Sequence, residues 1–276
     1  MSNQRTHYVT TTDGVTIGGT VHGQGPPLVF LQGLIGDGDL DWTRVVEHLT
    51  DRFTCHLPSR RSRGLSGDHP DLSGGRATDD VLAYVDSIGE QIGLVGWSGG
   101  ANQALAVAAR SEVVDAVAPF EPVMQGLMDE QVQAELGGAV GEMGELAAQG
   151  RLPAAARAFA GWPFKEEEIT VAEDAGYFEA AGRYVPNLLG LLQQLMEHGD
   201  PTGDPAVLGA ISAPVLVLHG SKTKTFFTAS ARHVADQVSN ARIQEIPGAG
   251  HAAPLTHPEA LAKALAGFFA PTQQLA

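Results

Sequence analysis

A serine set among glycines is the residue whose type and setting most clearly suggest chemistry. Ser98 is the centre of the stretch Gly-Trp-Ser-Gly-Gly, which follows the apolar run 92–95 and precedes small residues at helical spacing over 101–109. This strand–turn–helix order predicts a nucleophile elbow, in which a strained turn lifts the serine hydroxyl clear of the sheet. The elbow needs small residues two positions before and after the serine, where Gly96 and Gly100 stand. The alternative is an ordinary Gly/Ser loop, which the flanking patterns disfavour.

A serine hydroxyl is a poor nucleophile, so it needs a base within hydrogen-bond reach and a third group that orients the base. In parallel sheets such groups gather at the carboxyl ends of strands. Of the ten histidines, His251 has the best position, because it follows the apolar run 243–246 in a glycine-rich loop before the last expected helix. His219 also ends an expected strand and is the competitor, although its apolar strand favours a structural role. We therefore expect His251 to be the base.

The orienting acid is harder to place, because two strand ends between the serine and the histidine could carry it. The usual loop, residues 220–227, holds two lysines and no carboxylate, and Asp236 falls well inside the next helix. Glu121 directly follows an apolar strand and precedes a proline, so we expect it to orient His251. Asp115 is an alternative acid, but it opens that strand and should lie at the wrong end of the sheet. A solvated surface glutamate is the alternative interpretation of Glu121.

An oxyanion formed at the serine would need backbone donors. The N–H after the nucleophile, that of Gly99, is the first, and the second should come from the loop after the third strand. That loop contains Gln32, Gly33 and Leu34. Leu34 is our first choice for the second donor and Gly33 the runner-up. The glycines of this loop would otherwise serve simply as turn residues.

Strand and helix patterns alternate along most of the chain, which predicts a mostly parallel sheet with right-handed crossovers. From about residue 123 to 205 apolar residues fall only at helical spacing, which predicts a helical cap inserted between two strands. We expect residues 1–122 and 206–276 to form the core and 123–205 the cap. The expected strands are 8–11, 15–21, 28–31, 53–57, 92–95, 113–120, 214–218 and 241–246, and the expected core helices are 42–49, 78–88, 101–109, 227–238 and 258–269.

Composition sets outer limits on function. The 276 residues are 43% hydrophobic, enough for one sizeable core, and the formal charge is −15. The sequence shows no basic cluster interleaved with aromatics, which argues against a nucleic-acid partner. Neither the N-terminal segment 1–14 nor any later stretch has the apolar run of a signal peptide or membrane helix, so we expect a cytoplasmic protein without membrane insertion. Cys55 is the sole cysteine, which excludes an internal disulfide. A homo-oligomer is compatible with the sequence.

Four segments together resemble the α/β-hydrolase superfamily, of the capped lipase/esterase-like kind: FLQG, RRSRGLSGD, VGWSGGA and GAGHAAPLTHPE. The resemblance runs from Tyr8 to the C-terminal helix and implies an eight-stranded, mostly parallel sheet with helices on both faces and the cap after the sixth strand. Two departures stand out: Gln32 replaces a common histidine, and Glu121 replaces the usual late aspartate. The second is similar to a subgroup of bacterial hydrolases and to zearalenone lactonases, which residues 223–227 also resemble.

The resemblance implies a mechanism. Ser98 would attack an ester or lactone carbonyl while His251 takes its proton and Glu121 fixes the imidazole tautomer. Water activated by His251 would then release the acid, with no metal or organic cofactor. Two other activities stay open: cleavage of a C–C bond in a diketone-like substrate, and ligand binding by a relative with negligible turnover.

Specificity would come from the cap and the residue beside the nucleophile. We expect an apolar roof that suits a small apolar ester or lactone better than a charged substrate, although plain cap core is the alternative for these side chains. Arg60, Arg61 and Arg63 could bind a carboxylate, or pair with acids and brace their loop. The expected substrate-binding residues are Trp97, Met124, Met128, Trp162, Tyr184 and Leu188.

Overall fold

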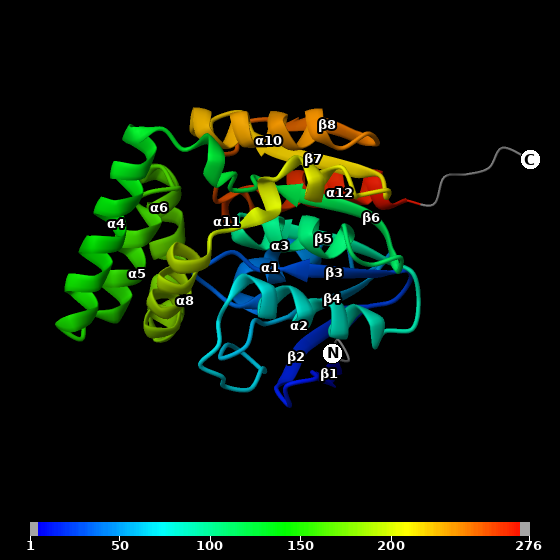
Figure 1. Cartoon of the computed structure of the whole chain (residues 1–276), viewed down its shortest axis with the longest axis horizontal. Helices are drawn as coiled ribbons and strands as arrows, with labels where there is room; N and C mark the ends of the chain where they lie inside the picture. The colour runs from blue at the N-terminus through cyan, green and yellow to red at the C-terminus, as the bar shows by residue number, and fades with distance from the viewer. Residues whose placement is uncertain (1–4, 271–276) are drawn as a thin grey trace, which may run out of the picture.

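The computed structural model describes residues 5–270, and its strands form one mixed sheet of eight strands in the order β1-β2-β4-β3-β5-β6-β7-β8 (Figure 1). Pairs β1–β2 and β2–β4 are antiparallel, and every later pair is parallel. Residues 1–4, part of the segment examined for a signal peptide, lie outside the described range. The strands are β1 (Arg5–Thr10), β2 (Thr16–Gly23), β3 (Pro27–Leu31), β4 (Thr54–Pro58), β5 (Ile92–Trp97), β6 (Val114–Phe120), β7 (Val215–Gly220) and β8 (Ala241–Ile246).

The central strands are apolar on both faces, because helices cover both sides of the sheet. Alternate residues of β3 show the division: Leu28 and Phe30 join one buried cluster, whereas Val29 and Leu31 join the other. The first cluster is completed by α1 (Gly38–Val46), α11 (Ala253–Thr256) and α12 (Pro258–Phe269), and the second by α2 (Gly74–Asp86), α3 (Gly99–Ala108) and α10 (Thr225–Gln237).

Residues 121–214, all of them described, form helices and loops without a strand. Helices α4, α5, α6 and α8 stand together beside the core, on the left of Figure 1. Met143, Phe159 and Leu188 join this helical insertion to the α1-side cluster. The helices are α4 (Glu130–Ala148), α5 (Leu152–Ala160), α6 (Glu166–Asp174), α7 (Tyr177–Ala181), α8 (Val185–His198) and α9 (Pro205–Leu208), with 3₁₀ turns η1 (Gln125–Leu127), η2 (Gly182–Tyr184) and η3 (Pro201–Gly203).

Helix α2 begins earlier than predicted. The sequence pattern placed its start at Thr78, whereas the helix starts at Gly74. Gly74 and Gly75 have poor intrinsic helix propensity, which hides the first turn from a pattern-based prediction. No helix within residues 5–270 is both long enough and apolar enough to cross a membrane.

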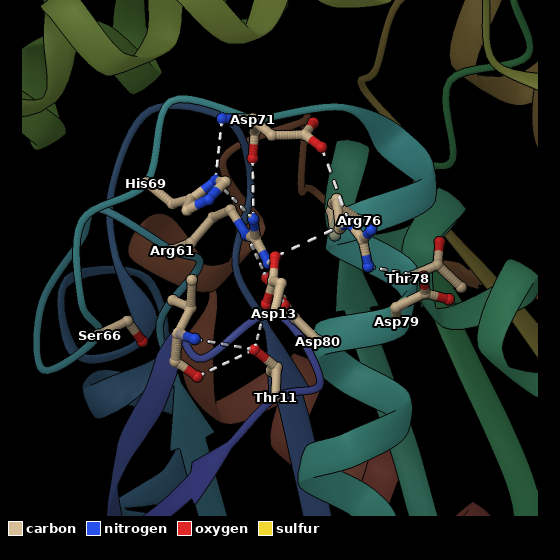
Figure 2. A network of polar contacts seen from close by, with 12 residues as sticks. Thr11, Asp13, Arg61, Ser66, His69, Asp71, Arg76, Thr78, Asp79 and Asp80 are labelled. Atoms are coloured by element: carbon tan, nitrogen blue, oxygen red, sulfur yellow. Dashed lines mark hydrogen bonds and ion pairs between the residues drawn. The ribbon is translucent and has the colours of Figure 1, made fainter.

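Arg61 joins three segments near the amino-terminal hairpin (Figure 2). Its guanidinium donates to both carboxylate oxygens of Asp80 on α2, at 2.6 and 2.7 Å, and to Asp13 in the β1–β2 turn at 3.1 Å. It also donates to the carbonyl of Asp71 at 3.0 Å. The side chain is 2% exposed and that of Asp80 is 5% exposed. A buried, bidentate pair of this kind costs much more to break than a surface ion pair.

We expect Arg61→Met to lower the free energy of unfolding by roughly 3–5 kcal/mol, because it leaves the Asp80 carboxylate buried without its cation. Urea unfolding followed by circular dichroism measures the loss. Arg76 supplies the matched control, since it pairs with Asp13, Asp71 and Asp79 at 3.6–3.7 Å and its side chain is 37% exposed. Arg76→Met should cost less than about 1 kcal/mol. Equal losses in the two variants would contradict the role given to Arg61.

Candidate active site

A tight turn with Ser98 at its centre joins β5 to α3, as the elbow prediction requires. Ser98 has φ 56° and ψ −122°, a left-handed conformation that L-residues rarely adopt. The turn is tight: a Cβ added to Gly96 would lie 2.2 Å from the carbonyl oxygen of Gly100. A Cβ on Gly100 would lie 2.3 Å from the carbonyl oxygen of Gln32. Both positions therefore require glycine, and the serine hydroxyl is placed beyond the end of the strand.

His251 and Glu121 are in direct contact in the buried interior. Nδ1 of His251 lies 2.6 Å from Oε2 of Glu121, and the two side chains are 1% and 0% exposed. A hydrogen bond from Nδ1 to the carboxylate would leave Nε2 of His251 free to accept a proton. Phe227 stacks on the imidazole with ring centroids 4.1 Å apart. Within residues 5–270 no hydrogen bond joins Ser98 Oγ to His251, and such contacts often tighten only when substrate binds.

The Glu121 carboxylate is fixed by the loop that lacks an acid of its own. Its Oε1 accepts from the backbone N–H of Gly220 and its Oε2 from the hydroxyl of Thr223, both at 2.8 Å. The residue itself has φ 49°, an uncommon conformation for a glutamate, held by its surroundings. Full burial contradicts the interpretation of Glu121 as a solvated surface residue. The sequence suggested no role for Gly220 or Thr223, because only carboxylates were sought there.

The competing groups lie elsewhere. Asp236 is exposed on α10, and Asp115 is exposed at the opposite end of β6 from Glu121. His219 is buried at the end of β7, where its Nδ1 is 3.1 Å from the carbonyl oxygen of Gly220. None of the three lies beside Ser98 in the cavity described below.

The loop after β3 separates the two candidates for the second oxyanion donor. The N–H of Gly33 donates to Oδ2 of Asp41 at 2.8 Å and is therefore occupied. The N–H groups of Leu34 and Gly99 donate to no other group within residues 5–270. Leu34 also packs on Gly99, since a Cβ added to that glycine would lie 2.5 Å from its Cδ2. The geometry thus favours Leu34 over Gly33 as the partner of Gly99.

Gln32 and Arg63 hold that loop in place. The Gln32 side chain donates to the carbonyl of Gly36 at 2.8 Å and accepts from the backbone N–H of Arg60 at 3.0 Å. Nη1 of Arg63 donates to the carbonyls of Leu34 and Gly36 at 2.7 and 2.8 Å. The amide of Gln32 thus braces the loop on both sides.

A cavity of about 1110 Å³ lies between the sheet and the helical insertion, and its wall is mostly apolar. Ser98 and His251 line it together with both candidate oxyanion donors. Three of the predicted substrate-binding residues line it as well: Trp97, Met128 and Trp162.

The other three predicted substrate-binding residues lie outside the cavity. Met124 is buried in the core on the α2 side, and Leu188 packs in the core shared with the insertion. Tyr184 donates from its hydroxyl to Asp37 and accepts from the N–H of Gly64 at 3.1 Å, so it braces two loops. Helical spacing showed that these side chains are buried but could not show which buried face borders the cavity.

One insertion residue secures the loop that carries His251. Glu168, in the first turn of α6, accepts from the backbone N–H of Ala252 at 2.7 Å and from that of Lys165 at 3.0 Å. Burial raises the pKa of this carboxyl. Trp97 ties the same loop to the elbow, because its indole N–H donates to the carbonyl of His251 at 2.8 Å. Glu168 was not predicted, since an acid in a helix first turn usually serves only the helix.

Asp41 is a buried acid behind the oxyanion loop. It accepts from Gly33 and from the hydroxyl of Tyr177, each at 2.8 Å. Burial raises its pKa to about 7, although both hydrogen bonds oppose the rise. The folded protein therefore binds a proton here that the unfolded chain releases above its pKa of about 4. Stability from this group is full below about pH 4 and is lost as the pH rises through about 7.

We expect Asp41→Asn to remove that loss, since asparagine cannot ionise. Between pH 5.5 and 8.0 the wild type should lose roughly 2 kcal/mol more unfolding free energy than the variant. Urea titrations at the two pH values measure the difference, with the surface variant Asp51→Asn as control. An identical pH dependence in wild type and Asp41→Asn would show that Asp41 does not titrate in this range.

Known proteins resemble the chain over most of its length. The pimeloyl-[acyl-carrier protein] methyl ester esterase of Chromobacterium violaceum is 26% identical over 273 residues, 88% of this chain and 94% of that protein. The structure of an alpha/beta hydrolase from Sphaerobacter thermophilus matches with TM-score 0.73 and 27% identity, covering 95% of this chain and 100% of that one. The enol-lactonase from Burkholderia xenovorans matches with TM-score 0.74 over 96% and 100% of the two chains, and its 19% identity speaks for the fold alone.

The sequence resemblance and the eight-stranded sheet are both confirmed by these matches. A model of the alpha/beta hydrolase family matches residues 21–264, which is most of the chain. The chain therefore belongs to the alpha/beta hydrolase family.

Proposed function

We propose that this protein is a serine hydrolase that cleaves a carboxylic ester or lactone of a largely apolar small molecule. The observation that carries the proposal is the buried contact of 2.6 Å between His251 and Glu121, beside a serine at a strained elbow in one apolar cavity. The names of the relatives agree with this class, since one is a methyl ester esterase and another an enol-lactonase.

In this proposal Ser98 attacks the carbonyl carbon while Nε2 of His251 takes the hydroxyl proton. Glu121 holds the imidazole in the required tautomer and stabilises the imidazolium that forms. The N–H groups of Gly99 and Leu34 stabilise the oxyanion of the tetrahedral intermediate. His251 then protonates the leaving alcohol and activates the water that hydrolyses the acyl-enzyme.

The helical insertion, residues 123–205, serves as the cap in this proposal. Met128 and Trp162 place apolar surface over the elbow, and Trp97 supplies the wall beside the nucleophile. An apolar wall that excludes water strengthens the electrostatic contacts at the reacting carbonyl.

We expect a fluorophosphonate probe to label the folded protein once, on the peptide that contains Ser98, because the elbow and His251 activate that hydroxyl. Peptide mass mapping locates the label, and Ser98→Ala and urea-unfolded wild type serve as unlabelled controls. A folded protein whose Ser98 stays unlabelled would favour a ligand-binding relative without turnover.

We expect Glu121→Gln to reduce kcat by about 10⁴-fold, because a neutral amide no longer selects the productive imidazole tautomer. Aryl ester hydrolysis measures kcat, and circular dichroism checks the fold. Asp236→Asn is the matched control, since Asp236 is exposed on α10, and it should leave kcat unchanged. A near-normal kcat in Glu121→Gln would remove Glu121 from the proposed mechanism.

A further inference from the structure

Arg60 differs from its two neighbours in the loop after β4. The guanidinium of Arg61 donates hydrogen bonds to Asp80, to Asp13 and to the carbonyl of Asp71, as described above. Arg63 makes three hydrogen bonds through Nε and Nη1, and only its Nη2 lacks a hydrogen-bond partner within residues 5–270. Nε and Nη2 of Arg60 are inaccessible to solvent and have no hydrogen-bond partner within residues 5–270. Arg60 therefore has hydrogen-bonding capacity that the protein itself does not use.

Arg60 is half-buried and lines the same cavity as Ser98 and His251. Burial lowers the pKa of its guanidinium to about 10, so the group remains charged at neutral pH. An unpaired cation at the wall of an apolar cavity is costly unless an anion or water compensates it. The cavity is the route by which a compensating anion would reach it.

The acids closest to Arg60 are committed to other partners. Asp80 is paired with Arg61, and Asp41 accepts from Gly33 and Tyr177. The carboxylate of Asp200, which also lines the cavity, accepts from Asn102 at 2.6 Å and from the N–H of Thr202 at 2.9 Å. None of the three forms an ion pair with Arg60 within the described residues.

The surroundings of Arg60 suit an anion. A small second cavity of about 30 Å³ is lined by Arg60, by the Arg61–Asp80 pair and by Ala77 of the first turn of α2. That turn contains Gly74 and Gly75, has no acidic residue, and its N-cap Ser73 makes no side-chain cap bond. Its amides therefore add positive potential on the same side of the main cavity.

We propose that Arg60 determines specificity by binding a carboxylate on the substrate, at the end remote from the bond that is cleaved. The preferred substrate would then be an apolar chain with an ester or lactone at one end and a free carboxylate at the other, such as a dicarboxylic acid half-ester. The apolar wall holds the chain and the guanidinium holds its charged end. This inference rests on the proposed hydrolase function and refines its expected apolar substrate.

The test compares monomethyl esters of straight-chain dicarboxylic acids with methyl esters of the monocarboxylic acids of equal length. We expect the wild type to prefer the half-ester at the chain length that spans the cavity. Arg60→Gln should lower the ratio of kcat/KM for half-ester over neutral ester by about 10–100-fold, mainly through KM, as expected for one charged hydrogen-bonding partner. Arg110→Gln is the matched control, because Arg110 also lines the cavity but is paired with Asp79 at 3.0 Å.

A second measurement separates this inference from the hydrolase proposal. Calorimetric titration of Ser98→Ala with heptanoate and with heptanol needs no turnover. We expect binding of heptanoate that is weakened about tenfold or more when Arg60→Gln is added, and no such change for heptanol. If neutral esters are hydrolysed but half-esters are not preferred, the Arg60 inference fails and the hydrolase proposal stands.

Two further outcomes would overturn the inference. An equal fall for neutral and charged esters in Arg60→Gln would show that Arg60 only braces its loop, with water in the small cavity as its partner. If Arg60→Gln does not fold, the inference is tested on the wild type alone. The two measurements are then its preference for half-esters over neutral esters and its inhibition by heptanoate relative to heptanol. Equal inhibition by the two compounds, without half-ester preference, would exclude a carboxylate site.

Discussion

The site depends on the hydrogen bond between His251 and Glu121, two residues 130 positions apart that meet in full burial. Such a contact is strong in a low-dielectric interior and costly to leave half-made, so both loops must be held accurately. The pairing of β6 with β7 places Phe120 opposite Leu218, which brings the end of β7, at Gly220, against the Glu121 carboxylate. The bracing contacts of Thr223 then keep that carboxylate in place.

Because the acid that contacts His251 follows β6, the loop after β7 has a different structural role. Where this loop carries an acid, it would present a carboxylate to the histidine, whereas here it presents an N–H and a hydroxyl to the glutamate. Residues 220–227 thus contain no carboxylate of their own but supply two hydrogen-bond donors to the carboxylate of Glu121. Phe227 follows in the next turn and stacks on the imidazole, so the segment still positions His251.

The fold, the elbow and the position of His251 were predictable because each rests on a local pattern: an apolar run, a glycine spacing, a strand end. The occupied N–H of Gly33 was not predictable, since it depends on Asp41, whose burial only the tertiary structure reveals. The residues that form the cavity wall could not be predicted from the sequence either. Met128 and Met124 have the same residue type and lie close in sequence, yet only Met128 borders the cavity, because the chain turns between them.

Glu168 limits how freely this architecture can diversify. Its carboxylate belongs to the insertion but completes the hydrogen bonding of the backbone next to His251. The insertion is therefore not a detachable module: exchanging it whole for that of a relative would leave the Ala252 amide buried without an acceptor. Under the proposed function, changes in substrate range would disturb the site least in α4 and α8, which contribute residues to the cavity wall. Those two helices could then be remodelled while α6 is kept together with the core.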